Sequence, residues 1–322
     1  MIEYRAAMTT RGPSTRGSTS DAATAGAATA DVIAVGTAMG AVTLHVGDLD
    51  AMTAYYRDVL MLQVLDAIAP ATGVLPVHAA ATVVLGRAAT PLVILRHAPD
   101  LPAPRRGQAG LFHTAILFDT ESDLAAALAS IAARAPGTFA GSADHLVSKA
   151  FYFTDPEGNG IELYWDRVRS DWKWVGGSVQ MGSLALDPNA FLREHLSDAA
   201  LENPGDAVVG HVHLSVGDVP SARAFYVDTL GFEVSAHWNG ALFVAAGGYH
   251  HHLAMNTWDS AGAGPRASSL GLGEVAILVP AADDVAALAG RLAGHGVTAR
   301  DDGATLSFED PWRNLIRVSA AA

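Results

Sequence analysis

Two stretches of this sequence are near copies of each other and decide the fold. Residues 44–64 read LHVGDLDAMTAYYRDVLMLQV, and residues 214–234 read LSVGDVPSARAFYVDTLGFEV. They align without a gap at an offset of 170 residues, with 9 of 21 positions identical. Each copy predicts a strand, a turn containing Gly-Asp, a helix with a buried aromatic pair, and a second strand. Such a repeat indicates one supersecondary unit used more than once.

A second pair of related segments completes the unit. Residues 153–161 (FTDPEGNGI) and 308–316 (FEDPWRNLI) each predict a strand, an Asp-Pro turn and another strand. We therefore expect an α+β protein built from four βαβββ modules, at about 38–99, 110–167, 208–259 and 271–322. In chain order, we expect a first domain over 37–167 (modules one and two), a connector over 168–207, and a second domain over 208–322 (modules three and four).

The N-terminal residues 1–36 form an Ala/Thr/Ser/Gly tract with three arginines. The tract has no long apolar segment of the kind that secretory signals contain, and its composition is typical of a disordered extension. Met8 is an alternative first residue. We expect a cytoplasmic protein.

Composition excludes several classes of function. Lys and Arg number 20 against 33 Asp and Glu, a formal net charge of −13, and basic residues do not cluster, which argues against nucleic-acid and anionic-membrane partners. Apolar runs stay far below the roughly 20 residues of a membrane span. Cysteine is absent, which excludes disulfides, thiol catalysis and cysteine-ligated metals. Any metal must therefore be bound by His and carboxylate side chains.

A βαβββ unit used in pairs resembles the vicinal oxygen chelate superfamily, which includes glyoxalase I, extradiol ring-cleaving dioxygenases, epimerases and antibiotic-sequestering proteins. The resemblance covers nearly the whole chain after the N-terminal tract. It implies that two modules curve around a shared cavity and that a divalent metal is bound from their first and last strands. It also implies a homo-oligomer. The fold alone does not name the activity.

Only modules two and three carry metal-binding side chains at both of the positions that this resemblance marks. The first strands offer Ala41, His113, His211 and Glu274 in modules one to four. The last strands offer an aliphatic run, then Glu162, then His252 within a Tyr-His-His-His segment, then Arg317. His113, Glu162 and His211 would form a facial triad that suits Fe(II), with Mn(II) as an alternative and His252 as a candidate fourth ligand. A metal also accounts for a carboxylate in the otherwise apolar strand of Glu162.

Residues 145–162 (HLVSKAFYFTDPEGNGIE) resemble the signature of extradiol dioxygenases of the catechol 2,3-dioxygenase type. The resemblance implies that Glu162 binds iron and that His145 and Tyr152 lie over the substrate hydroxyls. A plain β-hairpin would explain the Asp-Pro turn, but not this spacing of His, Tyr and Glu.

The family also has an acid/base histidine near the metal, in a His pair that resembles His250-His251-His252. Strand alternation places His252 beside the metal, whereas the family register indicates His251 as the acid/base residue. The sequence leaves this choice open.

Two arrangements of the modules remain. Pairing neighbours along the chain would leave only His45 to complete the set around His113 and Glu162. Pairing module two with module three collects both histidines and the glutamate around one cavity, and we favour this arrangement, with modules one and four as the structural partner.

The function that follows is an Fe(II) extradiol dioxygenase, which inserts O2 into catechol or a substituted catechol to give a ring-opened semialdehyde acid. Its partners would be a small aromatic diol and O2. A glyoxalase-like lyase or isomerase using nickel or zinc is the alternative, and a non-enzymatic ligand-binding protein of the same fold is the third.

Overall fold

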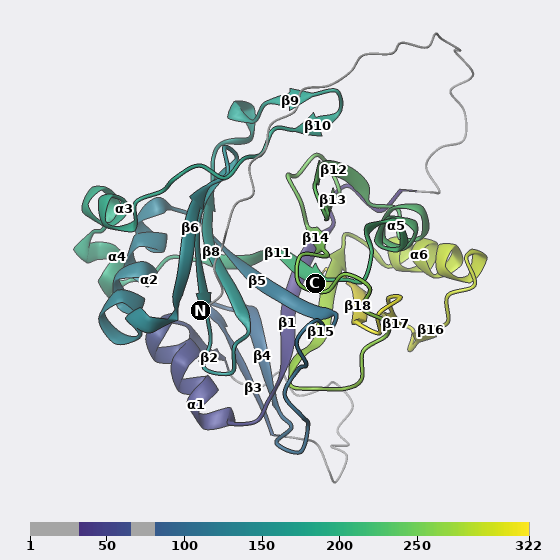
Figure 1. Ribbon diagram of the computed structural model, residues 1–322, viewed down its shortest axis with the longest axis horizontal. Helices are drawn as coiled ribbons and strands as arrows, with labels where there is room; N and C mark the ends of the chain where they lie inside the picture. Colours follow the sequence, from purple (N-terminus) through teal and green to yellow (C-terminus); the bar gives the residue numbers. More distant parts are fainter. Residues whose placement is uncertain (1–31, 66–80, 322) are drawn as a thin grey trace.

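The computed structural model describes residues 32–65 and 81–321, and two eight-stranded sheets dominate it (Figure 1). Modules one and four form one sheet, here called the 1–4 sheet, and modules two and three form the other, the 2–3 sheet. The favoured pairing of modules two and three is confirmed, and the arrangement that needed His45 is not found. Each sheet draws on both of the predicted sequence domains, 37–167 and 208–322.

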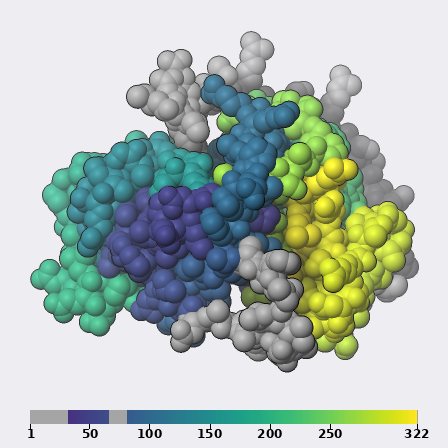
Figure 2. All heavy atoms as spheres, turned by 90° about the horizontal axis from the view of Figure 1, so that it is seen from below, coloured from purple at the N-terminus to yellow at the C-terminus, as the bar shows by residue number. Residues whose placement is uncertain are grey.

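The 1–4 sheet joins segments from opposite ends of the chain. Its first strands from each module, β1 and β15, pair antiparallel at the centre, and Figure 2 shows module one in purple and blue beside module four in yellow. The strands in spatial order are β16 (Ala299–Asp301), β17 (Thr305–Glu309), β18 (Leu315–Ala320), β15 (Gly271–Val279), β1 (Ala38–Val46), β4 (Thr90–His97), β3 (Thr82–Arg87) and β2 (Gln63–Leu65).

The 2–3 sheet repeats this plan. The first strands of modules three and two again pair antiparallel at the centre, and each runs parallel to the last strand of its own module. The strands in spatial order are β12 (Glu233–Trp238), β13 (Ala241–Ala245), β14 (Leu253–Asn256), β11 (Ala207–Ser215), β5 (Gly110–Phe118), β8 (Gly160–Asp166), β7 (Ser148–Thr154) and β6 (Phe139–Asp144).

Each module contributes one main helical segment, as the repeat predicts. In the two copies of the repeat the α-helix continues as a π-helical turn that contains the aromatic pair. The segments are α1 (Leu49–Ala54) with η1 (Tyr55–Val59), α2 (Glu121–Arg134), α5 (Val219–Arg223) with η4 (Ala224–Thr229), and α6 (Ala282–Gly294). No helix among residues 32–65 and 81–321 is long and apolar enough to cross a membrane.

Buried Tyr–Asp pairs tie consecutive modules together. The Tyr56 hydroxyl of module one donates to Asp155 of module two at 3.0 Å, and Tyr226 of module three donates to Asp310 of module four at 2.9 Å. Both acceptors begin the Asp-Pro turns that the sequence marks as repeated. The predicted core aromatics therefore also anchor these turns.

One hydrophobic core joins the two sheets. Val42 and Leu44 of β1 belong to the same buried cluster as Val212 and Leu214 of β11. Because strand side chains alternate between faces, His211 and His213 point to the opposite face of β11, away from this core. The histidines are thus directed to the concave side of the 2–3 sheet.

The connector at 168–207 is partly structured, with η3 (Arg169–Asp171), β9 (Trp174–Val175), β10 (Ser178–Val179), α3 (Pro188–His195) and α4 (Asp198–Glu202). A 3-10 turn, η2 (Pro136–Thr138), follows α2. Of the predicted N-terminal extension, residues 1–31 lie outside the described residues. Within residues 32–36, Ile33 is buried and its N–H donates to the Gly231 carbonyl at 2.9 Å.

Candidate metal centre and active site

Three adjacent strands at the centre of the 2–3 sheet bring the predicted triad together. Ala115 of β5 lies opposite His211 of β11 on one side and Glu162 of β8 on the other. His113 lies two residues before Ala115 and so points to the same face. The small Ala115 side chain leaves room between the three larger side chains around it.

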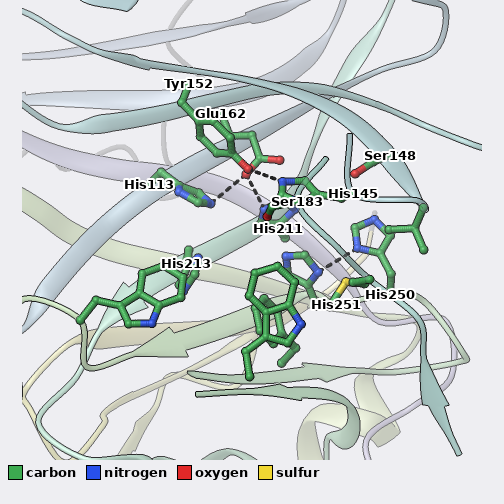
Figure 3. A pocket seen from close by; sticks show the side chains of 15 residues that line it. His113, His145, Ser148, Tyr152, Glu162, Ser183, His211, His213, His250 and His251 are labelled. Carbon is green, nitrogen blue, oxygen red and sulfur yellow. Dashed lines mark hydrogen bonds and ion pairs between the residues drawn. The ribbon is translucent and has the colours of Figure 1, made fainter. Parts of the chain in front are cut away.

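The triad is compact and buried. Oε2 of Glu162 lies 3.0 Å from Nε2 of His113 and 3.2 Å from Nε2 of His211. One ligand atom from each of the three residues lies within 4.8 Å of the others. Figure 3 shows the three side chains converging from their strands.

The donor set fits a divalent metal. Nε2 of His113 is buried without a hydrogen-bond partner among the described residues, although it lies 3.0 Å from the carboxylate. Such a nitrogen costs free energy unless it binds something. Two imidazoles and one carboxylate on one side of a cavity form the facial set that leaves other metal positions open.

The protonation states of the triad also suit a metal. Burial raises the pKa of the Glu162 carboxyl, but the neighbouring His211 and His113 more than offset this, and the pKa lies well below its usual range. Burial lowers the pKa of His211 to about 4. At neutral pH the chain therefore presents a carboxylate and a neutral imidazole, the forms that bind metals.

His145 and Tyr152 lie together beside the triad. Tyr152 pairs in register with Glu162 across β7 and β8, and its hydroxyl lies 2.6 Å from Nε2 of His145. Nδ1 of His145 lies 2.5 Å from the carbonyl of Gly182, which only accepts, so this nitrogen carries the hydrogen. The Tyr152 hydroxyl then donates to Nε2.

The backbone next to His145 is strained. Leu146 has a φ of 71°, which is uncommon for a residue other than glycine, and its N–H donates to the Asp144 carboxylate at 2.9 Å. Strain of this kind clusters at functional sites.

His251, and not His252, reaches the cavity. The His251 ring packs on His211 with centroids 4.0 Å apart and lines the pocket. Nδ1 of His252 accepts the backbone N–H of Ala246 at 3.1 Å. The predictions of His252 beside the metal and of His252 as a fourth ligand are therefore not matched by this geometry. The alternation argument fails because β14 begins only at Leu253, after a turn.

The pocket wall has residues that the sequence did not single out for the site. The connector supplies Met181 and Ser183, so it is part of the site and not only a link. Trp238, Phe243 and Trp258 line the pocket. Trp165, Trp172 and Trp174, which lie nearer to Glu162 in the sequence, are not among the lining residues. The complete lining is His113, His145, Val147, Ser148, Tyr152, Glu162, Met181, Ser183, His211, His213, Trp238, Phe243, His250, His251 and Trp258.

His213 is a further histidine of the pocket, and strand alternation makes its position predictable from the sequence. His213 shares the face of His211 by strand alternation and lies directly opposite His113. The Asn256 side chain lies 3.0 Å from Nε2 of His213. The pairing with Asn256, in a distant strand, has no sequence signal.

The paired βαβββ modules of this chain have the fold of the vicinal oxygen chelate class, and their cavity contains a group of two histidines and one carboxylate. The chain matches the model of the Glyoxalase/Bleomycin resistance protein/Dioxygenase superfamily over residues 38–163 and 208–318, and it belongs to this superfamily. A relative named Catechol-2,3-dioxygenase, from Bacillus subtilis (strain 168), is 37% identical over 225 residues, which cover 68% of this chain and 78% of that protein.

Solved structures share the fold. A putative dioxygenase from Bacillus subtilis subsp. subtilis str. 168 aligns with a TM-score of 0.59 at 12% identity, over 90% of this chain and 86% of that one. Glyoxalase I from Zea mays aligns with a TM-score of 0.54 at 17% identity, over 88% of this chain and 92% of that one. At these identities the likeness concerns the fold alone.

Proposed function

We propose that this chain is an Fe(II)-dependent extradiol dioxygenase that cleaves the ring of catechol or a substituted catechol. The observation that carries the proposal is the buried group of His113, Glu162 and His211, with His145, Tyr152 and His251 beside it. The relative named Catechol-2,3-dioxygenase supports the same reaction. Both oxygen atoms of O2 enter the product, a semialdehyde acid, so no external reductant is needed.

His113, Glu162 and His211 would hold the metal. Iron bound there supplies the electron transfer between an electron-rich ring and O2 that amino-acid side chains cannot supply. Mn(II) prefers the same kinds of ligand and stays an alternative.

The surrounding side chains would handle the protons of the diol. Burial lowers the pKa of His251 well below its usual range, so its ring is neutral at neutral pH and has an unshared nitrogen pair to offer a diol hydroxyl. Tyr152 donates to His145 and is thereby held toward the substrate side of the triad. Apolar walls, including Phe243 and Trp238, exclude water from the reacting ring.

A glyoxalase-like lyase or isomerase has less support. Its main sequence argument was His252 as a fourth ligand, and the nitrogen Nδ1 of His252 is occupied by the Ala246 N–H. A cytoplasmic location, a homo-oligomer and the domain boundaries at 37–167 and 208–322 stay predictions.

The test is metal content and ring cleavage in matched variants. Wild type, His211→Ala and His45→Ala are each loaded with iron under anaerobic conditions and then compared. His45 is a histidine on the first strand of module one, in the other sheet. We expect about one iron per chain and a yellow cleavage product from wild type and His45→Ala, and loss of both in His211→Ala. Iron retention by His211→Ala, or turnover without iron, would refute the proposal.

A further inference from the structure

His250 and Asp166 form a hydrogen-bond chain that ends on His251, outside the metal group. Nε2 of His250 lies 2.9 Å from Oδ1 of Asp166, and Nδ1 of His250 lies 2.8 Å from Nδ1 of His251. His250 is buried, with 1% of its surface exposed. Figure 3 shows His250 beside His251, with the contact between them marked.

Asp166 is held firmly in place. It lies four residues after Glu162 at the end of β8, on the same strand face. The Tyr249 hydroxyl donates to its second oxygen, Oδ2, at 2.8 Å. The Tyr164 hydroxyl lies 2.8 Å from that of Tyr249 and, because Tyr249 already donates to Asp166, Tyr164 is the donor. Both carboxylate oxygens of Asp166 thus have a defined partner.

For a neutral His250, the order of donors and acceptors along this chain of hydrogen bonds fixes the hydrogen positions on both rings. A carboxylate only accepts, so Nε2 of His250 carries the hydrogen. Nδ1 of a neutral His250 then has an unshared pair and accepts from Nδ1 of His251. A neutral His251 with its hydrogen on Nδ1 has an unshared pair on Nε2. No hydrogen bond of that nitrogen occurs among the described residues, and the ring lines the pocket.

We propose that Asp166 and His250 are positioning residues, which fix the ring orientation and the tautomer of His251 so that Nε2 enters the pocket as a proton acceptor. The inference rests on the proposed function, because it concerns how His251 would take a proton from a bound diol. Without the Asp166 oxygen, His250 can place its hydrogen on Nδ1, and His251 then presents an N–H to the pocket. That tautomer cannot accept a proton at Nε2.

The first variant is Asp166→Ala, which removes the acceptor, with Asp166→Asn as the conservative variant whose side-chain oxygen can still accept from Nε2–H. Asp171→Asn is the matched control, since Asp171 is exposed and lies outside the pocket lining. Loss of a residue that orients an active group commonly costs about 10–100-fold in activity. We expect this loss in kcat for Asp166→Ala, a smaller change in KM, unchanged iron content, and substantial recovery in Asp166→Asn.

The second readout does not depend on activity. Nitrogen NMR of zinc-loaded protein, with the His251 signal identified by its absence in His251→Gln, reports which ring nitrogen carries the hydrogen. We expect Nδ1–H in wild type and Asp171→Asn, and a mixture or Nε2–H in Asp166→Ala. Should Asp166→Ala fail to fold, His250→Phe asks the same question with a ring of similar size.

The outcomes separate this inference from the proposed function. An unchanged His251 tautomer and unchanged kcat in folded Asp166→Ala or His250→Phe would overturn the positioning role. A shifted tautomer in a protein that cleaves no catechol, even as wild type, would support the hydrogen-bond assignment and refute the dioxygenase.

Discussion

Arg317 and Glu274 form an ion pair at 3.0 Å in the 1–4 sheet, at the positions that Glu162 and His113 occupy in the 2–3 sheet. In the 1–4 sheet, Ala41 occupies the position that corresponds to His211 in the 2–3 sheet. A guanidinium stands in the 1–4 sheet where a metal site would need a carboxylate, so the two sheets share a fold but not a donor set. Among the described residues, a group of three side chains placed to bind a metal is found only in the 2–3 sheet.

We therefore predict that Glu274→Gln leaves metal binding unchanged. The Arg317 side chain is 44% exposed, and ion pairs of this kind contribute below about 1 kcal/mol. Iron content and turnover should equal those of wild type, while Glu162→Gln should lose both. Elemental analysis and a ring-cleavage assay on the two variants measure this. A fall in iron content in Glu274→Gln would mean that the 1–4 sheet also binds metal.

Ala115 should be intolerant of a larger side chain. It is fully buried between His211 and Glu162, and added methyl groups in a packed site typically cost about 1–3 kcal/mol. We expect Ala115→Val to weaken metal binding by at least about tenfold. Ala276→Val is the matched control, because Ala276 lies opposite Arg317 in the other sheet. Titration with a competing chelator measures both, and equal affinities would show that Ala115 does not shape the site.

The triad was predictable because repeats and strand alternation place side chains by rule. His113 and His211 occupy corresponding positions in two modules, and Glu162 belongs to the last strand of one of them. The pairing of modules two and three followed from the same chemistry, since only those modules have a metal-binding side chain at both positions. The structure then brings these three residues within 4.8 Å of one another.

The rest of the site depends on turns and long-range contacts, which follow no period. The turn that precedes β14 determines which of His251 and His252 faces the pocket. Gly247 and Gly248 in this turn have φ of 61° and 69°. The partner of His145 is a carbonyl of the connector at Gly182. The link from His250 to Asp166 crosses 84 residues. None of these contacts has a signal in the local sequence.

The substrate should lack an anionic group on its ring. No Lys or Arg is present among the described residues that line the pocket, and Trp238, Phe243 and Trp258 form much of its apolar wall. An unpaired carboxylate buried against such a wall is costly. We expect kcat/KM for 4-methylcatechol to exceed that for 3,4-dihydroxyphenylacetate on the order of 100-fold, equivalent to about 3 kcal/mol.

A cationic side chain introduced into the pocket wall should reduce the preference for 4-methylcatechol over 3,4-dihydroxyphenylacetate. Trp258→Arg places a guanidinium at the pocket, whereas Trp174→Arg places one on the exposed β9 strand outside the lining. Steady-state kinetics with both substrates should show a smaller preference only in Trp258→Arg. A wild-type preference for the carboxylated diol would contradict this account of the wall.

Asp155 should make folding stability depend on pH. Burial raises the pKa of Asp155 to about 6 from its ordinary 3.8, despite hydrogen bonds from Asn159 and Tyr56. Between these two values the folded chain holds a proton that the unfolded chain releases, so this group's contribution to stability falls as pH rises. From pH 4.5 to 7 the loss should be about 2 kcal/mol.

Urea unfolding of metal-free protein at both pH values measures this effect. Asp155→Asn cannot titrate, so the free energy of unfolding of wild type minus that of the variant should be about 2 kcal/mol smaller at pH 7 than at pH 4.5. Asp218→Asn is the control, because Asp218 is an exposed N-cap of α5 and Asn caps helices equally well. Its difference from wild type should stay nearly constant. Asp155 accepts four hydrogen bonds, from the Tyr56 hydroxyl, the Asn159 amide and two backbone N–H groups. If the difference in unfolding free energy between wild type and Asp155→Asn is the same at both pH values, these bonds offset the effect of burial on the pKa of Asp155 in full.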